Sequence, residues 1–197
     1  MQRIRHILII FALGLLALGS QAAAVDINGV KVPDQVSVNA TPLQLNGAGT
    51  RYKVIFKVYV AGLYLGQKAD TPDKVINQPG PKRLSVTMVR DIDAAELGKL
   101  LTRGIEDNMG KAALSKLVPG LLRMGQIFSD QKKLVAGDNF MIDWVPGSGT
   151  VITVKGQVQG EPFKEPEFFN ALMSIWLGPS PADHQLKAAL LGGKQAG

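Results

Sequence analysis

Residues 47 to 66, GAGTRYKVIFKVYVAGLYLG, place one arginine and one tyrosine among lysines within an apolar segment. If residues 51 to 64 form one strand, alternation puts Arg51 and Tyr59 on the same face, together with Lys53 and Lys57. A guanidinium group binds a carboxylate through two hydrogen bonds, and a phenol adds another. This face predicts a site for an amphipathic anion. A solvent-facing sheet surface has the same alternation and remains the alternative.

The spacing of these two side chains limits the prediction. Eight residues of straight strand separate Arg51 from Tyr59 by about 26 Å, which is too far for both to hold one small group. Both reach one head group only if the chain bends or reverses between them. The preceding Gly47-Ala48-Gly49 resembles the start of a dinucleotide-binding loop, but the third glycine and the helix are missing. We expect a tight turn there.

Other chemistry is restricted by the residue inventory. The chain has two histidines, His6 and His184, and no cysteine. A Ser-His-Asp relay, a cluster of histidine ligands, a thiolate metal site and a disulfide are therefore excluded, and we expect neither a metal nor a cofactor. The carboxylates are scattered, with no pair placed for acid and base roles. His184 is expected to be an exposed helix residue.

The first 24 residues read as a signal peptide. Arg3 and Arg5 precede an apolar run over residues 7 to 18, and three alanines then lead to Val25. The run is shorter than the roughly 20 residues that cross a bilayer, and without cysteine there is no lipoprotein anchor. We expect a periplasmic or secreted protein with no stable membrane anchor after cleavage, and one domain over residues 25 to 197.

The charge of this domain argues against one class of partner. Without Arg3 and Arg5, 20 basic residues stand against 16 acidic ones, a net charge of +4. The excess is spread along the chain, with no basic arm, so we expect no nucleic-acid partner.

The order of the periodic segments predicts an α+β domain, with helices on one side of an antiparallel sheet. Asn28-Gly29 indicates a hairpin, and Asp93 with Glu96 caps a helix. Pro119-Gly120 is expected to break the next helix into two pieces. Strands are predicted within residues 25 to 65, 83 to 89, 139 to 145 and 150 to 158, and helices from 93, over about 112 to 128, over 166 to 178 and from Ser180.

Two motifs give the chain a resemblance to a known family. They are G-x-G-x-R ahead of V-Y-x-A-G-L-Y, and the closing W-L-G-x-x-P-x-D-x-x-L-K-x-x-L-L-G. The chain resembles the chalcone isomerase-like proteins, specifically their secreted bacterial branch, over nearly all of residues 25 to 197. The resemblance implies an open-faced β-sandwich: a large antiparallel sheet, a layer of helices, and a ligand cleft between them.

The resemblance also implies a choice between two functions. Plant enzymes of the family close a chalcone ring with an arginine that polarises the carbonyl, whereas plastid relatives bind fatty acids through an arginine and a tyrosine. Arg51 matches the arginine of both, and Tyr59 resembles the binders' tyrosine. The isomerases' water-positioning tyrosine has no counterpart, since residues 84 to 128 contain none. Leu172 and Met173 resemble the family's ligand-contacting pair, with helix core as the alternative.

These observations favour a non-catalytic periplasmic binder of a fatty acid or similar amphipathic carboxylate, with Arg51 as ion-pair partner and Tyr59 as hydrogen-bond donor. One alternative is an isomerase, an intramolecular lyase of the chalcone type, with Arg51 as electrophile. A further alternative is a structural or partner-binding envelope protein, in which Arg51 belongs to a buried ion pair.

Overall fold

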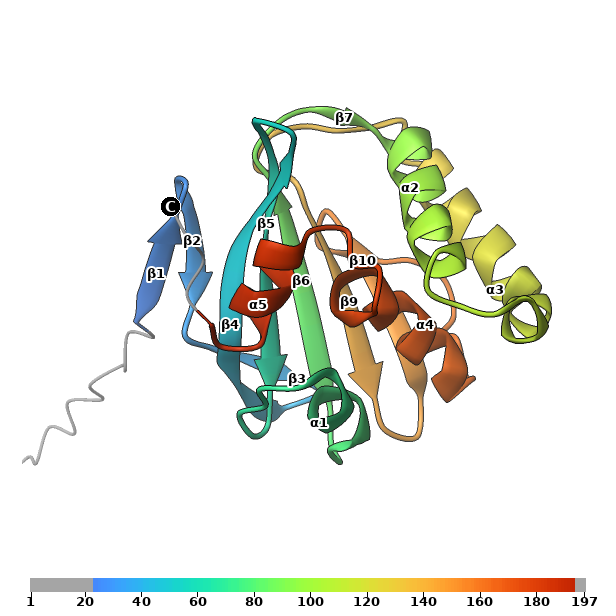
Figure 1. Cartoon of the computed structure of the whole chain (residues 1–197), viewed down its shortest axis with the longest axis horizontal. Helices are drawn as coiled ribbons and strands as arrows, with labels where there is room; N and C mark the ends of the chain where they lie inside the picture. Colours follow the sequence, from blue (N-terminus) through green and yellow to red (C-terminus); the bar gives the residue numbers. More distant parts are fainter. Residues whose placement is uncertain (1–22, 194–197) are drawn as a thin grey trace, which may run out of the picture.

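The computed structural model describes residues 23 to 193 of the 197-residue chain. They form a layer of strands covered on one side by helices (Figure 1). This arrangement confirms the predicted α+β class and the open-faced β-sandwich. The predicted signal peptide lies outside the described residues except for Ala23 and Ala24.

A seven-stranded antiparallel sheet forms the centre of the molecule. Its strands are β3 (Gln35–Val38), β4 (Thr41–Lys53), β5 (Phe56–Leu65), β6 (Lys82–Met88), β9 (Asn139–Val145), β10 (Gly149–Val154) and β11 (Gln157–Val158). The order across the sheet is β11-β10-β9-β6-β5-β4-β3, so most strands pair with a neighbour in the sequence.

A separate hairpin of β1 (Ala24–Ile27) and β2 (Val30–Pro33) lies beside the outer face of the sheet. Its turn is the predicted Asn28-Gly29 pair, and both residues have positive φ, 52° and 82°. Val32 of this hairpin packs in one apolar cluster with Val60 and Tyr64 of β5. The hairpin therefore gives part of the outer face a small core of its own.

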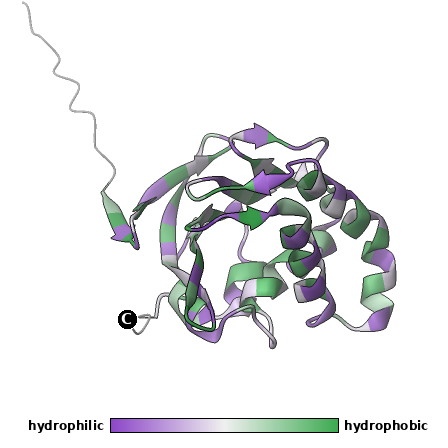
Figure 2. Ribbon diagram, turned by 90° about the horizontal axis from the view of Figure 1, so that it is seen from above, coloured by the Kyte–Doolittle hydropathy of each residue, from purple (hydrophilic) through white to green (hydrophobic). Residues whose placement is uncertain are grey.

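The helices cover the opposite face and bury the main core against the sheet (Figure 2). They are α1 (Pro72–Asn77), α2 (Ala94–Glu106), α3 (Lys111–Ser129), α4 (Pro166–Leu177) and α5 (His184–Leu190). A short pair of strands, β7 (Ile92–Asp93) and β8 (Lys133–Leu134), flanks α2 and α3. No helix among the described residues is long and apolar enough to cross a membrane.

The helix boundaries confirm one of the predicted signals and correct two expectations. Asp93 caps α2, since its carboxylate accepts a hydrogen bond of 2.9 Å from the Glu96 amide. The expected break at Pro119 is wrong: α3 continues through it. Pro119 is exposed, and so is Ser115, whose carbonyl group loses its helical partner, so the interruption lies on the solvent side of the helix. The last helix begins at His184, which is exposed, and not at Ser180.

Candidate functional site

The chain reverses between the two predicted site residues. Strand β4 ends at Lys53 and β5 begins at Phe56, with Val54 and Ile55 as the turn. The prediction of one continuous strand over residues 51 to 64 is therefore wrong. It failed because the turn contains no glycine, proline or asparagine; Val54 itself adopts the left-handed backbone conformation, with φ of 59°.

This reversal brings Arg51 and Tyr59 together. They are direct cross-strand partners in the β4–β5 pair, next to an irregularity in register between Arg51 and Tyr52. The Cζ atom of Arg51 lies 5.8 Å from the centre of the Tyr59 ring, within the range of a cation–π contact. Arg51 is half-buried, whereas Tyr59 is only 5% exposed. Their side chains are therefore close enough for a single small group beside them to meet both.

Trp176 of α4 completes the site. Its indole Nε1 donates a buried hydrogen bond of 2.8 Å to the Tyr59 hydroxyl oxygen. A phenol both accepts and donates, so this bond leaves the Tyr59 proton for a second partner. Among the residues from 23 to 193, none accepts a hydrogen bond from that proton. The site thus holds a buried phenol proton that makes no hydrogen bond within the described part of the protein.

The electrostatics of the site keep this donor neutral. Burial raises the pKa of Tyr59 to about 12, while the positive charge of Arg51 and the hydrogen bond from Trp176 partly oppose the shift and the carboxylate of Asp183 adds to it. The phenol therefore stays protonated at neutral pH. Arg51 makes no ion pair or hydrogen bond with any described residue, so its guanidinium fork is open to an anion.

Asp183 lies near the pair but is held by backbone amides. Its Oδ2 accepts a 2.9 Å hydrogen bond from the Tyr52 amide. Its Oδ1 accepts bonds of 2.8 and 3.0 Å from the Gln185 and Leu186 amides at the start of α5. The carboxylate therefore fixes the end of β4 to the first turn of α5.

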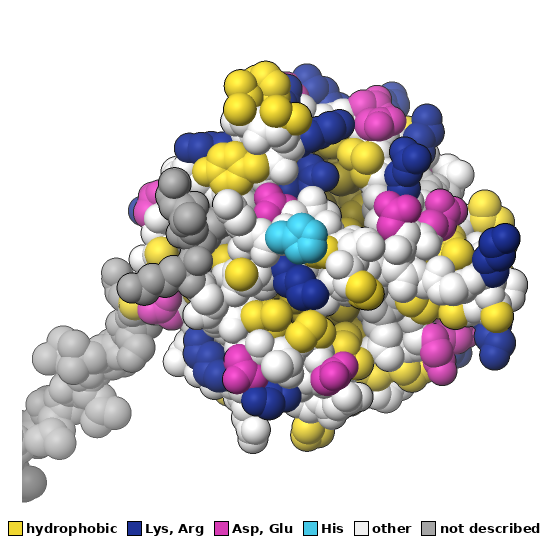
Figure 3. Space-filling model, in the orientation of Figure 1, with side chains coloured by type: hydrophobic (Ala, Val, Ile, Leu, Met, Phe, Trp, Pro, Cys, Tyr) yellow, Lys and Arg dark blue, Asp and Glu magenta, His cyan; other side chains and the backbone are white. Residues whose placement is uncertain are grey.

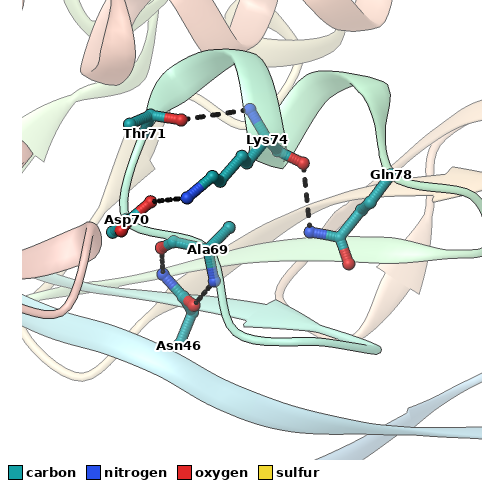
Figure 4. A network of polar contacts seen from close by, with 6 residues as sticks. All are labelled: Asn46, Ala69, Asp70, Thr71, Lys74 and Gln78. Carbon is teal, nitrogen blue, oxygen red and sulfur yellow. Dashed lines mark hydrogen bonds and ion pairs between the residues drawn. The ribbon is translucent and has the colours of Figure 1, made fainter.

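The other end of α5 is fixed to β4 by Asn46. Its buried amide nitrogen donates to the Leu190 carbonyl at 2.7 Å and to the Ala69 carbonyl at 2.8 Å, while its oxygen accepts from the Ala69 amide at 2.7 Å. Figure 4 shows the Asn46–Ala69 part of this network, next to the Thr71 cap of α1. Helix α5 is thus attached at both ends to the strand that carries Arg51.

The glycine-rich segment before Arg51 has a role different from the predicted one. Gly47-Ala48-Gly49 is not a tight turn; it lies within β4 and pairs with β5. A Cβ atom at Gly47 would lie 2.0 Å from the Ala189 carbonyl oxygen. The absence of a side chain therefore lets the end of α5 pack directly on the strand.

The two remaining predicted residues lie on α4. Leu172 is fully buried and belongs to the same core cluster as Tyr59 and Trp176. Met173 lines a groove of about 430 Å³ between α1, α4 and Lys187 of α5. Arg51 and Tyr59 do not line that groove, so the structure joins Arg51 with Tyr59 and leaves Leu172 and Met173 in the apolar surroundings. Trp176 was not predicted as a site residue, although it lies in the closing W-L-G motif.

Comparison with known proteins agrees with this fold. A family model described as "Chalcone isomerase-like" matches residues 24 to 192. Among solved structures, a fatty-acid binding protein of Arabidopsis thaliana has a similar fold, with a TM-score of 0.68 and 14% identity, over 87% of this chain and 96% of its own. The sequence has no significant match among curated proteins.

Proposed function

This chain belongs to the chalcone isomerase-like family, and we propose that it is a non-catalytic binder of a fatty acid or a similar amphipathic carboxylate. The observation that carries the proposal is the Arg51–Tyr59 pair. An open guanidinium fork and a buried phenol proton lie next to each other, both suited to an oxygen anion. The solved fatty-acid binding protein of similar fold is consistent with this reading.

The head group would meet three side chains with separate roles. Arg51 supplies a charge-assisted, bidentate contact to the carboxylate, and Tyr59 donates one further hydrogen bond. Trp176 orients the phenol without touching the ligand, because its N–H is already bound to the hydroxyl oxygen. Burial of Tyr59 strengthens its hydrogen bond, since less water competes for the donor.

The acyl chain would lie in the apolar layer between the sheet and α4. Met88 is the cross-strand partner of Tyr59 on β6, and Leu172 precedes Trp176 by one helical turn. The main core also contains Met124 and Met173. Unbranched methionine side chains repack around an inserted chain at a lower cost than branched ones. Leu172 and Met173 are therefore proposed as wall residues.

The isomerase alternative has less support. Helix α2 starts with Ala94 and Ala95, and residues 84 to 128 hold no tyrosine to position a water molecule. The purified protein should not accelerate cyclisation of a 2'-hydroxychalcone over buffer. A saturable rate that disappears in Arg51→Ala would establish the isomerase reading instead.

The location of the protein is also a proposal. Arg3, Arg5 and the apolar run before Val25 support export to the periplasm or the medium. A carboxylate binder there would collect or deliver its ligand outside the cytoplasm.

Calorimetry with a saturated fatty acid and its methyl ester tests the binding proposal. The acid should bind more tightly than the ester, which keeps the chain but not the anion. Arg51→Ala should weaken binding of the acid by about 1.5 to 3 kcal/mol, and Arg51→Lys should recover only part of the loss, because it restores the charge without the fork.

Arg103→Ala is the matched control, because Arg103 is an exposed arginine on α2. It should leave the affinity unchanged. Equal binding of acid and ester, or the absence of detectable binding to a folded wild-type protein, would contradict the proposal. In that case the charged pair has a structural or partner-binding role.

A further inference from the structure

The turn between β4 and β5 exposes three large apolar side chains. We call residues 53 to 57 the hairpin tip. Val54 is 90% exposed, Ile55 77% and Phe56 57%. Two of them are consecutive and β-branched, at a position where hairpins ordinarily have polar or glycine residues. A contiguous apolar projection of this kind marks a surface that is buried on contact with something else.

The tip is surrounded by positive charge. Lys53 and Lys57 flank the apolar residues in the sequence, and the Cζ atom of Arg90 lies 5.2 Å from the centre of the Phe56 ring. None of these three cations forms an ion pair with a described residue. The nearby carboxylate of Asp91 is bound to Lys133 at 2.7 Å. Figure 3 shows hydrophobic side chains at the top of the molecule, over the β4–β5 turn, with Lys and Arg next to them.

The apolar residues are kept at a cost in backbone energy. Val54 has a φ of 59°, a conformation that is unfavourable for β-branched residues and easy for glycine or asparagine. An asparagine there would relieve the strain and remove an exposed apolar side chain. The sequence has valine, which is less favourable than asparagine in this backbone conformation. We therefore look for the role of the apolar side chain outside the stability of the isolated fold.

We propose that the hairpin tip docks on an anionic lipid bilayer. Val54, Ile55 and Phe56 enter the boundary between head groups and acyl chains, and the surrounding cations contact lipid phosphates. A bilayer has anionic head groups above an apolar interior, and this matches apolar side chains surrounded by lysine and arginine. An acidic patch on a protein partner would match the cations but would give the apolar side chains no apolar surface to contact. The docking does not require a bound fatty acid.

Docking would also orient the Arg51–Tyr59 pair. Arg51 lies two residues before Lys53 on the same strand, which places its Cα about 7 Å further from the tip. With the apolar tip inserted, the pair lies close to the level of the lipid head groups. An amphipathic carboxylate in the bilayer has its own head group at that level.

Single fluorescent labels give the most direct test, because the natural chain has no cysteine. Ile55→Cys carries an environment-sensitive dye at the tip, and Leu122→Cys carries it on α3, where the native side chain is similarly exposed, 72% against 77%. The full chain is used for both, so residues 1 to 24 contribute equally. Vesicles of phosphatidylcholine with phosphatidylglycerol should shift the emission of the tip label to the blue and leave the α3 label unchanged.

Vesicle flotation of unlabelled variants provides the second measurement. The pair Val54→Asn with Ile55→Ser should lower the partition coefficient at least about tenfold, because two apolar side chains leave the interface. It should not lower thermal stability, since asparagine suits the backbone at residue 54. Lys53→Glu with Lys57→Glu should weaken binding to anionic vesicles, and added salt should weaken wild-type binding.

Arg51→Ala separates this inference from the proposed function. It removes the carboxylate partner but keeps the tip, so vesicle binding should remain. An unshifted tip label, equal shifts of both labels, or flotation unchanged by the tip substitutions would overturn the docking proposal. So would sedimentation showing that Val54→Asn with Ile55→Ser converts a dimer into a monomer, because the tip would then be a contact between two copies of the chain.

Discussion

Trp176 sets the position of the Tyr59 hydroxyl. A tyrosine in an apolar core can rotate its hydroxyl hydrogen, so the position of the oxygen and the direction of the proton depend on the partner that it finds. The indole N–H occupies one side of the oxygen at 2.8 Å. The proton of Tyr59 is thereby directed away from α4. The orientation of the hydroxyl group in the proposed site thus depends on a residue that would not touch the ligand.

Trp176→Phe should therefore weaken fatty-acid binding by about 0.5 to 1.5 kcal/mol, comparable with Tyr59→Phe and smaller than Arg51→Ala. Calorimetry with the acid measures this. Trp144→Phe is the matched control: Trp144 packs against Phe169, with ring centres 5.7 Å apart, and makes no bond to Tyr59. If both tryptophan variants lose the same affinity, the effect reflects general loosening of the core and not orientation of the phenol.

Only part of this site could be predicted from the sequence. The chemical types of Arg51 and Tyr59 pointed to an anion, and the resemblance of the surrounding motif to the family favoured the same prediction. Trp176 was missed because 117 residues separate it from Tyr59, and no local pattern indicates which buried side chain its N–H will meet. For Leu172 the position could be predicted but not the role: helical periodicity places it in the core without indicating whether a ligand also enters there.

At the scale of elements, α5 acts as a clamp on β4. Asp183 holds the Tyr52 amide at one end of the helix, and Asn46 holds the Leu190 carbonyl at the other. Beside the second attachment, the end of the helix backbone lies against Gly47. The strand is therefore fixed on both sides of the segment that leads to Arg51. A disturbance of α5 should reach the site through this strand.

Gly47→Ala tests the clamp. The added Cβ would meet two helix carbonyl oxygens, at 2.0 and 2.9 Å, and backbone cannot move aside as a side chain can. The free energy of unfolding should fall by about 2 to 4 kcal/mol, measured by denaturant titration. Gly66→Ala is the control, because nothing lies within 4 Å of a Cβ atom there. Similar losses in both variants would argue against a specific contact with α5.

The elements that the sequence predicted well have local causes. Asn28-Gly29 forms its hairpin because both residues tolerate positive φ, and Asp93 begins α2 because its carboxylate binds a free amide. The Val54–Ile55 turn has no such signal, since pairing along β4 and β5 imposes it on residues that prefer extended backbone. The prediction of a tight turn at Gly47 failed for the same reason, because this glycine is required by a contact with α5, more than a hundred residues away in the sequence.

For the whole molecule, two buried tyrosines predict loss of stability at high pH. Burial raises the pKa of both Tyr59 and Tyr64 to about 12, from an ordinary 10.0. Between these values the unfolded chain releases both protons while the folded protein keeps them, so the free energy of unfolding falls as the pH rises. The contribution of each phenol to stability is fully present below about pH 10 and falls by about 1.4 kcal/mol per pH unit between the unfolded pKa and the folded pKa of about 12.

Denaturant titrations from pH 9 to 12 measure this slope. Tyr59→Phe should make the decline shallower, Tyr64→Phe should do the same, and the double variant should show the smallest dependence. Comparison among variants cancels the titration of other groups. A slope that is identical in wild type and double variant would show that neither phenol resists ionisation in the folded protein.

Processing is a second property of the whole molecule. If residues 1 to 24 are a signal peptide, the intact mass of exported protein should correspond to a start at or within a few residues of Val25. Val25 pairs with Val32 in the β1–β2 hairpin, so a start there keeps nearly all of that element. An exported product that still begins at Met1 would exclude cleavage at this position.

The long connection between β6 and β9 has a consequence for the order in which the protein folds. Strands β3, β4 and β5 follow one another directly, and β6 follows after the short helix α1. Strands β9 to β11 are again consecutive, whereas β6 meets β9 only across residues 89 to 138. Short connections close quickly, while a long one must give up more chain entropy before its contacts form. We expect two hairpin arrays to form first and to join late along the β6–β9 seam. The Arg51–Tyr59 pair would then be in place before α4 brings Trp176 to it.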